Sequence, residues 1–317
     1  MAVADIKNPT PQTAATKTTD FSGFLKPEMS AALFEMARKS SAVMSLARRI
    51  PLGINGQSIP FSTSKATAAW VAEAGQKPTT ESSLGLKTIT PHKLACISVV
   101  SAEVVRANPG NYMSILRDDI AEAFAVAFDN AALHGTNSPF GAGNNLDATT
   151  KTVALGTAAA AAGSVYGDVV AGLDALVKDG KRLNGFLFSR EVEPLFLGSV
   201  DTTGRPLFID APPASQTTQA VTGGSVIGRP AFLGDNVANT PAGVGAKKTL
   251  GYGGDFAGQC VFGQVGGISY RVSTEATVTL GGNLVSLYEN NLVAILAEAE
   301  YGFLCNDPQA FVRYTAK

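Results

Sequence analysis

The sequence is poor in the residues from which most metal, redox and catalytic sites are built. Its 317 residues include three cysteines and two histidines, and none of them falls into a CxxC, HExxH or similar ligand spacing. Cys96, Cys260 and Cys305 lie far apart in apolar, strand-like stretches, so we expect inert buried thiols in a reducing compartment. His92 and His134 are likewise expected to have structural roles, His134 as a cation at the end of a helix.

Charge is also scarce, and it is balanced. Asp, Glu, Lys and Arg make up 16% of the chain, against ~25% in a typical soluble domain, and the net charge is −1. Such a protein has no basic field to recruit nucleic acid or an anionic membrane. With 45% hydrophobic residues, the low charge indicates a folded protein whose surface is largely covered by other subunits. The lack of long apolar runs argues against a transmembrane helix or a signal peptide.

Motifs of nucleotide binding and catalysis are missing too. Gly243–Thr249 has the wrong spacing for a phosphate-binding loop, and Gly251–Phe256 lacks the third glycine of GxGxxG. Glu298 and Glu300 share one face of an expected strand, but alternating alanine and glutamate is the ordinary pattern of a solvated sheet face. We therefore expect no enzyme activity, no catalytic residue, no cofactor and no metal site.

What the sequence does contain is organised around one long helix, expected over Asn111–His134. Its apolar residues recur every three or four positions and so share one face: Tyr112, Leu116, Ile120, Phe124, Phe128 and Ala131. Polar residues, Asp129 among them, are expected on the opposite face. Asn111 is placed to cap the start of the helix, and Gly135 to end it in a left-handed conformation. The length would be about 36 Å.

The chain before this helix is expected to be extended. Residues 1–23, rich in Thr, Ala and Pro, predict an arm. A first helix is expected from Pro27 and is expected to end at Ile50-Pro51. Residues 58–63 and 88–105 have strand character and enclose a polar stretch with the only tryptophan, Trp70. Such a hairpin has no core of its own and needs a partner surface. The tryptophan is expected to anchor an interface, with local packing as the alternative.

The chain after the long helix is expected to form an α+β unit with a central sheet flanked by helices. A helix is expected over 165–178, with Tyr166, Val170 and Val177 on its apolar face, and a short helix over 191–197. Short apolar stretches between glycine-rich turns predict strands at 185–189, 225–237, 249–256, 259–273 and 284–300, with one more near the C-terminus.

The order and spacing of several stretches also resemble a known family. They are AAWVAEAGQKPTTESSLGLKTITPHKLACISVVSAEVV (68–105), then the long helix with its HGTNSP exit, FLFSREVEPLFLGSVDTTGRPLF (186–208), IGRPAFLGDNV (227–237) and LGYGGDFAGQCVFGQVGGISYRVS (250–273). The sequence resembles the major capsid proteins of tailed bacteriophages, whose Hong Kong 97 fold is shared by encapsulin shells. The resemblance covers about residues 23–312.

The resemblance implies an α+β subunit of four parts. They are an N-terminal arm (1–26), an extended E-loop hairpin (52–95), a peripheral domain with the long spine helix (27–51, 96–145 and 286–317) and an axial domain (146–285). Within the E-loop, Trp70, Glu73 and Lys77 are the candidate contacts with a neighbouring subunit, the ring buried and the two charges at its rim.

The resemblance also implies a function. The subunit would self-assemble into hexamers and pentamers of an icosahedral phage head, built in the host cytoplasm and enclosing double-stranded DNA through non-specific contacts. Further partners would be a separate scaffolding protein, a portal and, as an option, decoration proteins. An encapsulin-type nanocompartment is the alternative with the same fold, and the arm disfavours it. A soluble α+β enzyme is the alternative of another class, for which the sequence shows no constellation.

Overall fold

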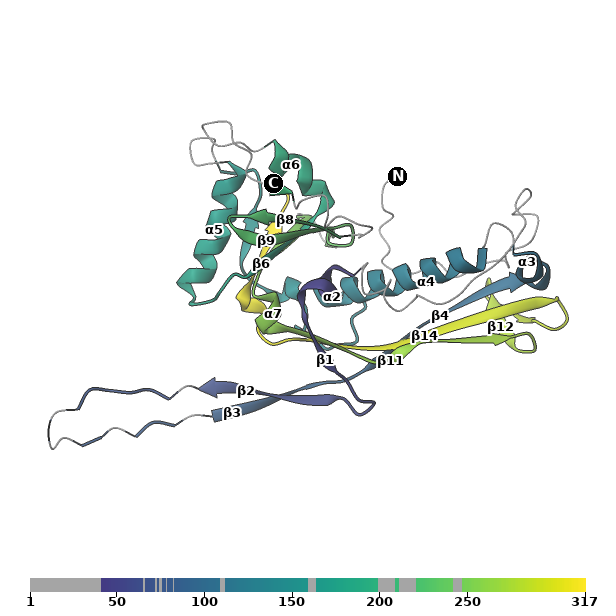
Figure 1. Cartoon of the computed structure of the whole chain (residues 1–317), viewed down its shortest axis with the longest axis horizontal. Coiled ribbons are helices and arrows are strands. Elements are labelled where there is room, and N and C mark those ends of the chain that lie inside the picture. Colours follow the sequence, from purple (N-terminus) through teal and green to yellow (C-terminus); the bar gives the residue numbers. More distant parts are fainter. Residues whose placement is uncertain are drawn as a thin grey trace.

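The computed structural model describes residues 41–64, 66–71, 73, 76–77, 79–81, 83–108, 112–158, 164–198, 209–210, 221–241 and 247–317. Figure 1 shows three regions: a long hairpin, a flat sheet under one long helix, and a second sheet with its own helices. The predicted arm and the first part of the predicted helix from Pro27 lie outside the described residues. Within the described ranges, no helix is both long enough and apolar enough to cross a membrane.

The long helix predicted at 111–134 is present. Helix α4 spans Tyr112–Asp129 and continues as the π-helical turn η3, Asn130–His134, and Gly135 ends it with φ 66°. Its apolar face, including Phe124 and Phe128, belongs to the main core cluster. The expected cap, Asn111, lies outside the described residues, whereas Asn108 Oδ1 accepts a hydrogen bond of 3.0 Å from the Met113 N–H.

Beneath α4 lies a four-stranded sheet built from distant parts of the chain (Figure 1). Its strands, in spatial order, are β1 (Arg48–Pro51), β11 (Cys260–Ser273), β14 (Leu292–Cys305) and β4 (His92–Ser101). β1 runs parallel to β11, and the other pairs are antiparallel. Alternation along β14 turns Tyr301 towards Phe128 of α4, with ring centroids 5.6 Å apart, and leaves Glu298 and Glu300 half-buried on the opposite face.

The start of this region differs from the prediction of one helix continuing to Pro51. Helix α2 spans only Ala42–Leu46, and Arg48 and Arg49 lie in β1. Parallel pairing with Val261 and Phe262 of β11 holds these residues in a strand. A contact with a strand two hundred residues away in sequence thus overrides the local helical pattern.

The long hairpin is formed by β2 (Gln57–Ser64) and β3 (Ser83–Ile89), which pair antiparallel and project from the rest of the molecule (Figure 1). The prediction of a single second strand over 88–105 was wrong. Pro91, which has no N–H to donate, separates β3 from β4, and residues 102–107 form helix α3 (Ala102–Ala107). Ser101 caps that helix, because its Oγ accepts a hydrogen bond from the Val104 N–H.

The second sheet has seven strands, and helix α5 (Val165–Lys178) lies beside it (Figure 1). In spatial order they are β5 (Thr152–Ala154), β15 (Phe311–Thr315), β10 (Thr249–Gly254), β6 (Gly185–Ser189), β9 (Arg229–Gly234), β8 (Val221–Val226) and β7 (Ile209–Asp210). The turn η6 (Arg190–Val192) and helix α6 (Glu193–Leu197) match the predicted short helix.

Two predicted strands are each divided by a turn. Residues 225–237 contribute to two antiparallel strands, β8 and β9, because Ile227 and Gly228 both adopt positive φ and reverse the chain. Residues 284–300 contribute to β13 (Asn283–Ser286) and β14, separated by a turn in which Asn291 has φ 51°. β13 pairs with β12 (Thr277–Leu280) to form a small hairpin.

Strand pairing also divides the chain differently from the boundaries that the resemblance implied. β11 lies within the range expected for the axial domain (146–285) but pairs with β14 and β1 beneath α4. β15 lies within the range expected for the peripheral domain (286–317) but pairs with β10 and β5 in the seven-stranded sheet. The chain therefore returns to the second sheet after leaving β14 at Cys305.

Replacing Gly172 with alanine is expected to destabilise the subunit. A Cβ at this position of α5 would lie 2.2 Å from the hydroxyl of Tyr314, which is fully buried and donates a hydrogen bond to the Val169 carbonyl. Overpacking of this kind costs about 1–3 kcal/mol, measurable as a lower denaturant midpoint of the subunit. Gly53→Ala is the matched control, because nothing lies within 4 Å of a Cβ there. Equal midpoints for the two variants would contradict the packing argument.

Candidate functional site at the domain junction and the hairpin tip

Three described segments of the chain cross from one sheet to the other. The first follows α4 and contains the turn η4 (Leu146–Ala148). The second is helix α7 (Phe256–Gln259), between β10 and β11. The third runs from β14 to β15 through the turn η8 (Pro308–Ala310). The side chains on these segments decide how firmly the two sheets are held relative to each other.

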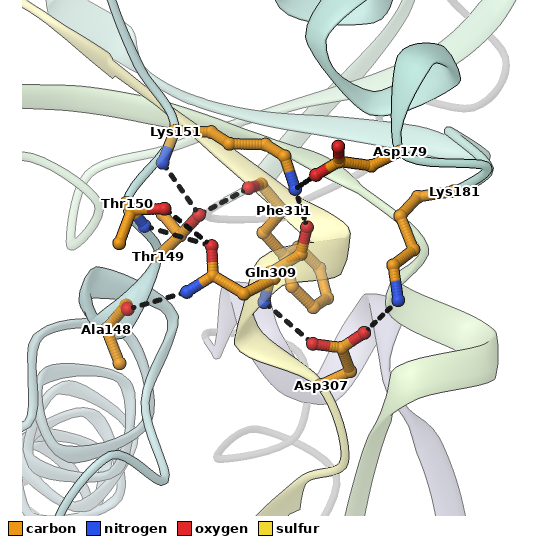
Figure 2. Close-up of polar contacts among 9 residues, drawn as sticks. All are labelled: Ala148, Thr149, Thr150, Lys151, Asp179, Lys181, Asp307, Gln309 and Phe311. Atoms are coloured by element: carbon orange, nitrogen blue, oxygen red, sulfur yellow. Dashed lines mark hydrogen bonds and ion pairs between the residues drawn. The ribbon is translucent and has the colours of Figure 1, made fainter.

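Gln309 joins the first and third crossing segments (Figure 2). Its Oε1 accepts hydrogen bonds from the Thr150 hydroxyl (2.8 Å) and the Thr150 N–H (3.2 Å). Its Nε2 donates to the Ala148 carbonyl at 3.3 Å. Next to it, the Thr149 hydroxyl donates to the Phe311 carbonyl at 2.6 Å. One glutamine side chain therefore supplies three hydrogen bonds to the first crossing segment, at Ala148 and Thr150.

Two lysines connect the segments around Gln309 to the end of α5 (Figure 2). Lys151 Nζ lies 2.7 Å from an Asp179 carboxylate oxygen and also donates to the Gln309 carbonyl. Lys181 forms an ion pair with Asp307, whose other carboxylate oxygen accepts the Gln309 N–H at 2.9 Å. Partial burial acts to raise the pKa of Asp307, but the hydrogen bonds from Lys181 and Gln309 outweigh it and hold that pKa below its ordinary value.

Asp147 forms the centre of a second, more buried group. One carboxylate oxygen accepts the Tyr252 hydroxyl (2.8 Å) and lies 3.4 Å from Arg313 Nη1, and the other lies 3.1 Å from His134 Nδ1. Burial acts to raise the pKa of Asp147, but the hydrogen bond and charge of His134, followed by Tyr252 and Arg313, lower it below the ordinary value. Burial, and then Asp147, raise the pKa of Tyr252 well above its ordinary value. This group joins the end of the spine helix to β10 and β15.

Asp129 makes a third connection, which its place in the helical pattern does not predict. It was expected on the polar face of the long helix, but it is completely buried. Its carboxylate accepts hydrogen bonds from the Ser41 hydroxyl (2.6 Å) and from the N–H groups of Ala42 (3.0 Å) and Val43 (3.3 Å). Burial outweighs these bonds and raises the pKa of Asp129 to about 6. Asp129 thus pins the start of α2 against the spine helix.

Gln309→Ala is expected to loosen the junction without unfolding either sheet. The variant loses the oxygen that accepts two hydrogen bonds from Thr150 and the amide that donates one to the Ala148 carbonyl. Because Thr150 is exposed, water can replace some of these hydrogen bonds. The expected loss is about 0.5–1.5 kcal/mol, with faster amide hydrogen exchange in 148–152. Gln309→Glu keeps the acceptor oxygen and should lose less. Unchanged exchange in this segment would show that Gln309 does not hold it.

The candidate contacts at the hairpin tip are all exposed. The Trp70 ring is 104% exposed, and the Glu73 and Lys77 side chains are also exposed. A hydrogen bond of 2.9 Å from the Thr67 N–H to the Thr80 hydroxyl joins the two limbs of the loop. The described contacts do not bring the three candidate side chains together. The exposure of Trp70 does not support the alternative, that its ring packs locally within the subunit.

Other apolar side chains are exposed along the subunit. Tyr166, Val170 and Val177 were expected on the packed face of α5, but they are 42%, 36% and 60% exposed. Exposed apolar residues elsewhere are Ile54, Leu84, Leu86, Ile97, Val272, Leu284 and Tyr288. A groove of about 690 Å³ also opens between α4, β4 and the loop around Phe140. Surfaces of this kind are typical of subunits that bury them against other copies.

Comparison with known proteins gives a consistent result. Residues 22–316 match the phage capsid family. The chain is 42% identical over 309 residues to the "Probable major capsid protein gp17" of Mycobacterium phage D29, and 43% identical over 314 residues to the protein so described from Mycobacterium phage L5. Both alignments cover 96% of this chain and 93% of the relative. A solved chain of Gordonia phage Cozz has the same fold, with a TM-score of 0.69, 22% identity and coverage of 92% of this chain and 89% of that one.

Proposed function

The chain belongs to the phage capsid family, and from this premise we propose that it is the major capsid protein of a tailed phage, whose copies assemble into an icosahedral head. The observation that carries the proposal is the match over nearly the whole length of two proteins described as major capsid proteins. The fold agrees with it: the Hong Kong 97-like α+β architecture expected from the resemblance is the architecture of the solved phage relative. The encapsulin and enzyme alternatives are correspondingly disfavoured.

We propose that the strand pairing defines the domains of the subunit. The peripheral domain would consist of α4 and the four-stranded sheet, including β11, and the axial domain of the seven-stranded sheet with α5, including β15. The E-loop hairpin (52–95) and the arm (1–26) would extend from these domains to neighbouring copies. The hydrogen bonds and ion pairs of the junction support the view that each domain keeps a set orientation within a shell.

We propose that the hairpin tip and the exposed face of α5 are contact surfaces between subunits. Trp70 would bury its ring on a neighbour, with Glu73 and Lys77 at the rim. The exposed apolar residues of α5 would meet other axial domains in hexamers and pentamers. A near-neutral net charge of −1 supports weak, sequence-independent contact with packaged double-stranded DNA. Assembly in the host cytoplasm with a scaffolding protein, a portal and decoration proteins belongs to the same proposal.

Negative-stain electron microscopy of the purified protein, alongside analytical ultracentrifugation, tests the proposal. We expect closed shells or rings of capsomers, in addition to the 32.7 kDa subunit. Nucleic acid without an enzyme inside particles from infected cells would favour a phage head, whereas a single co-purifying enzyme would favour an encapsulin. A stable monomer under every assembly condition would count against any shell function.

A further inference from the structure

Two of the three cysteines, far apart in sequence, are direct neighbours in the four-stranded sheet. Cys260 is the first residue of β11 and Cys305 is the last residue of β14. The antiparallel register makes them cross-strand partners. Both belong to the main core cluster, and both are free thiols in this structure. They mark the place where these strands leave the sheet for the two crossing segments of the junction.

The hydrogen-bond pattern shows which kind of cross-strand pair they form. The next pair outward, Gln259 and Asn306, takes a ladder hydrogen bond, with the Asn306 N–H donating to the Gln259 carbonyl at 2.8 Å. The Cys305 N–H does not donate across the ladder to Cys260 but to Asn144 Oδ1, at 2.5 Å. Because hydrogen-bonded and non-hydrogen-bonded pairs alternate in antiparallel sheets, Cys260 and Cys305 form a non-hydrogen-bonded pair.

This kind of pair suits a disulfide. In non-hydrogen-bonded pairs the Cα atoms are about 4.5 Å apart and the side chains approach most closely. Disulfides span Cα distances of about 4.4–6.8 Å. The Cys305 thiol is near enough to Cys260 to help raise the pKa of the Cys260 thiol. Cys96 serves as an internal reference, because its partner across the ladder is Ala297, which carries no sulfur.

We propose that Cys260 and Cys305 are an oxidisable dithiol that closes into an intrachain disulfide when the protein meets hydrogen peroxide. One thiol reduces the peroxide, becoming a sulfenic acid and releasing one water. The second sulfur then attacks the sulfenic sulfur, which forms the S–S bond and expels a second water. Two thiols and one peroxide thus yield one disulfide and two waters. The bond fastens the start of β11 to the end of β14 at the edge of the junction.

The surroundings of the pair set the conditions for this reaction. Burial, and then contact with Cys305, raise the pKa of the Cys260 thiol well above its ordinary value. Little thiolate is therefore present at neutral pH, and the pair oxidises slowly. In a reducing cytoplasm it stays as two thiols, which agrees with the expectation of inert cysteines there. Outside a cell, peroxide supplies the oxidant, and long exposure allows this slow oxidation to proceed. This chemistry is intramolecular and does not rest on the proposed capsid function.

Peptide mapping by mass spectrometry tests the proposal on the full-length protein. The protein is incubated with or without hydrogen peroxide, unfolded with N-ethylmaleimide present, and digested without reductant. After peroxide we expect a linked peptide pair containing Cys260 and Cys305, two hydrogens lighter than the free peptides, with alkylation only at Cys96. Cys305→Ser should abolish the linked pair, and Cys96→Ser should keep it. The oxidised wild type should also melt at a higher temperature, and dithiothreitol should reverse that shift.

Several results would overturn the proposal. They are full alkylation of all three cysteines after prolonged peroxide treatment, a disulfide that involves Cys96, and sulfinic or sulfonic acids at Cys260 and Cys305 without a link. The wild-type map decides between these outcomes even if a serine variant fails to fold. Because Cys260 and Cys305 are partners within one chain, we expect the same map for free subunits and assembled particles, whether or not shells form.

Discussion

Trp70→Ala is expected to leave the subunit folded and to block or strongly reduce shell assembly. The ring is completely exposed in the isolated subunit, so its removal takes nothing from either core. Truncating a tryptophan that is buried in an interface costs about 2 kcal/mol or more. A shell repeats this loss at every equivalent contact, so even a modest change per subunit shifts the assembly equilibrium far towards free subunits.

The measurement combines thermal melting of the free subunit with the yield of shells by light scattering and microscopy. Trp70→Phe keeps an aromatic ring and should assemble better than the alanine variant. Glu73→Ala, at an exposed position in the same loop, should have a smaller effect, because exposed charges at an interface rim contribute little. A lower melting temperature of the free Trp70→Ala subunit would place the ring in an intramolecular core. Normal assembly would exclude it as a contact residue.

Asp129→Ala is expected to destabilise the subunit, because its carboxylate is completely buried. It leaves one hydroxyl and two N–H groups at the start of α2 without their acceptor. Buried donors left unpaired cost about 1–3 kcal/mol each. Part of this cost is offset, because the variant no longer has to bury a charged carboxylate. We expect a net loss of about 1–3 kcal/mol at pH 7, read from denaturant midpoints. Asp119→Ala, at an exposed position of the same helix, is the control.

The effect of Asp129 should depend on pH in a defined direction. The pKa is about 6 in the folded state against an ordinary value of 3.8, so between these values the folded protein binds a proton that the unfolded chain releases. This carboxyl therefore contributes its full stability below pH 3.8, and the contribution is lost as pH rises through 6. The advantage of wild type over Asp129→Ala should grow by about 2 kcal/mol between pH 7 and pH 4. A constant or shrinking difference would refute this assignment.

Local sequence patterns were sufficient for several elements. The recurrence of apolar residues predicted the helix that ends at Gly135 and the α5 helix at Val165–Lys178. The apolar run at Gly185–Ser189 predicted β6, which is buried along its whole length. These features depend on residues within one or two turns of each other, so their periodicity is visible in the sequence. The order of these elements also carried the resemblance to the capsid family.

Local patterns failed where a distant part of the chain decides the outcome. Arg48 and Arg49 form a strand because β11 pairs with them, and Asp129 is buried because α2 docks on it. The periodicity of α5 placed Tyr166 and Val177 on a packed face, but the seven-stranded sheet covers only part of the helix. In each case the residue type permitted two states, and a long-range contact selected one.

By itself, the sequence determined the long helix, the coreless hairpin with its single tryptophan, the α+β character of the second half and the family. Only the tertiary structure decided which strands pair, that Gln309 and Asp147 hold the junction, and that Cys260 faces Cys305. The physical reason is the range of the interactions. Helix periodicity, caps and turns depend on residues that are close in sequence. Strand register and buried polar contacts, in contrast, arise between segments that meet only after the chain has folded.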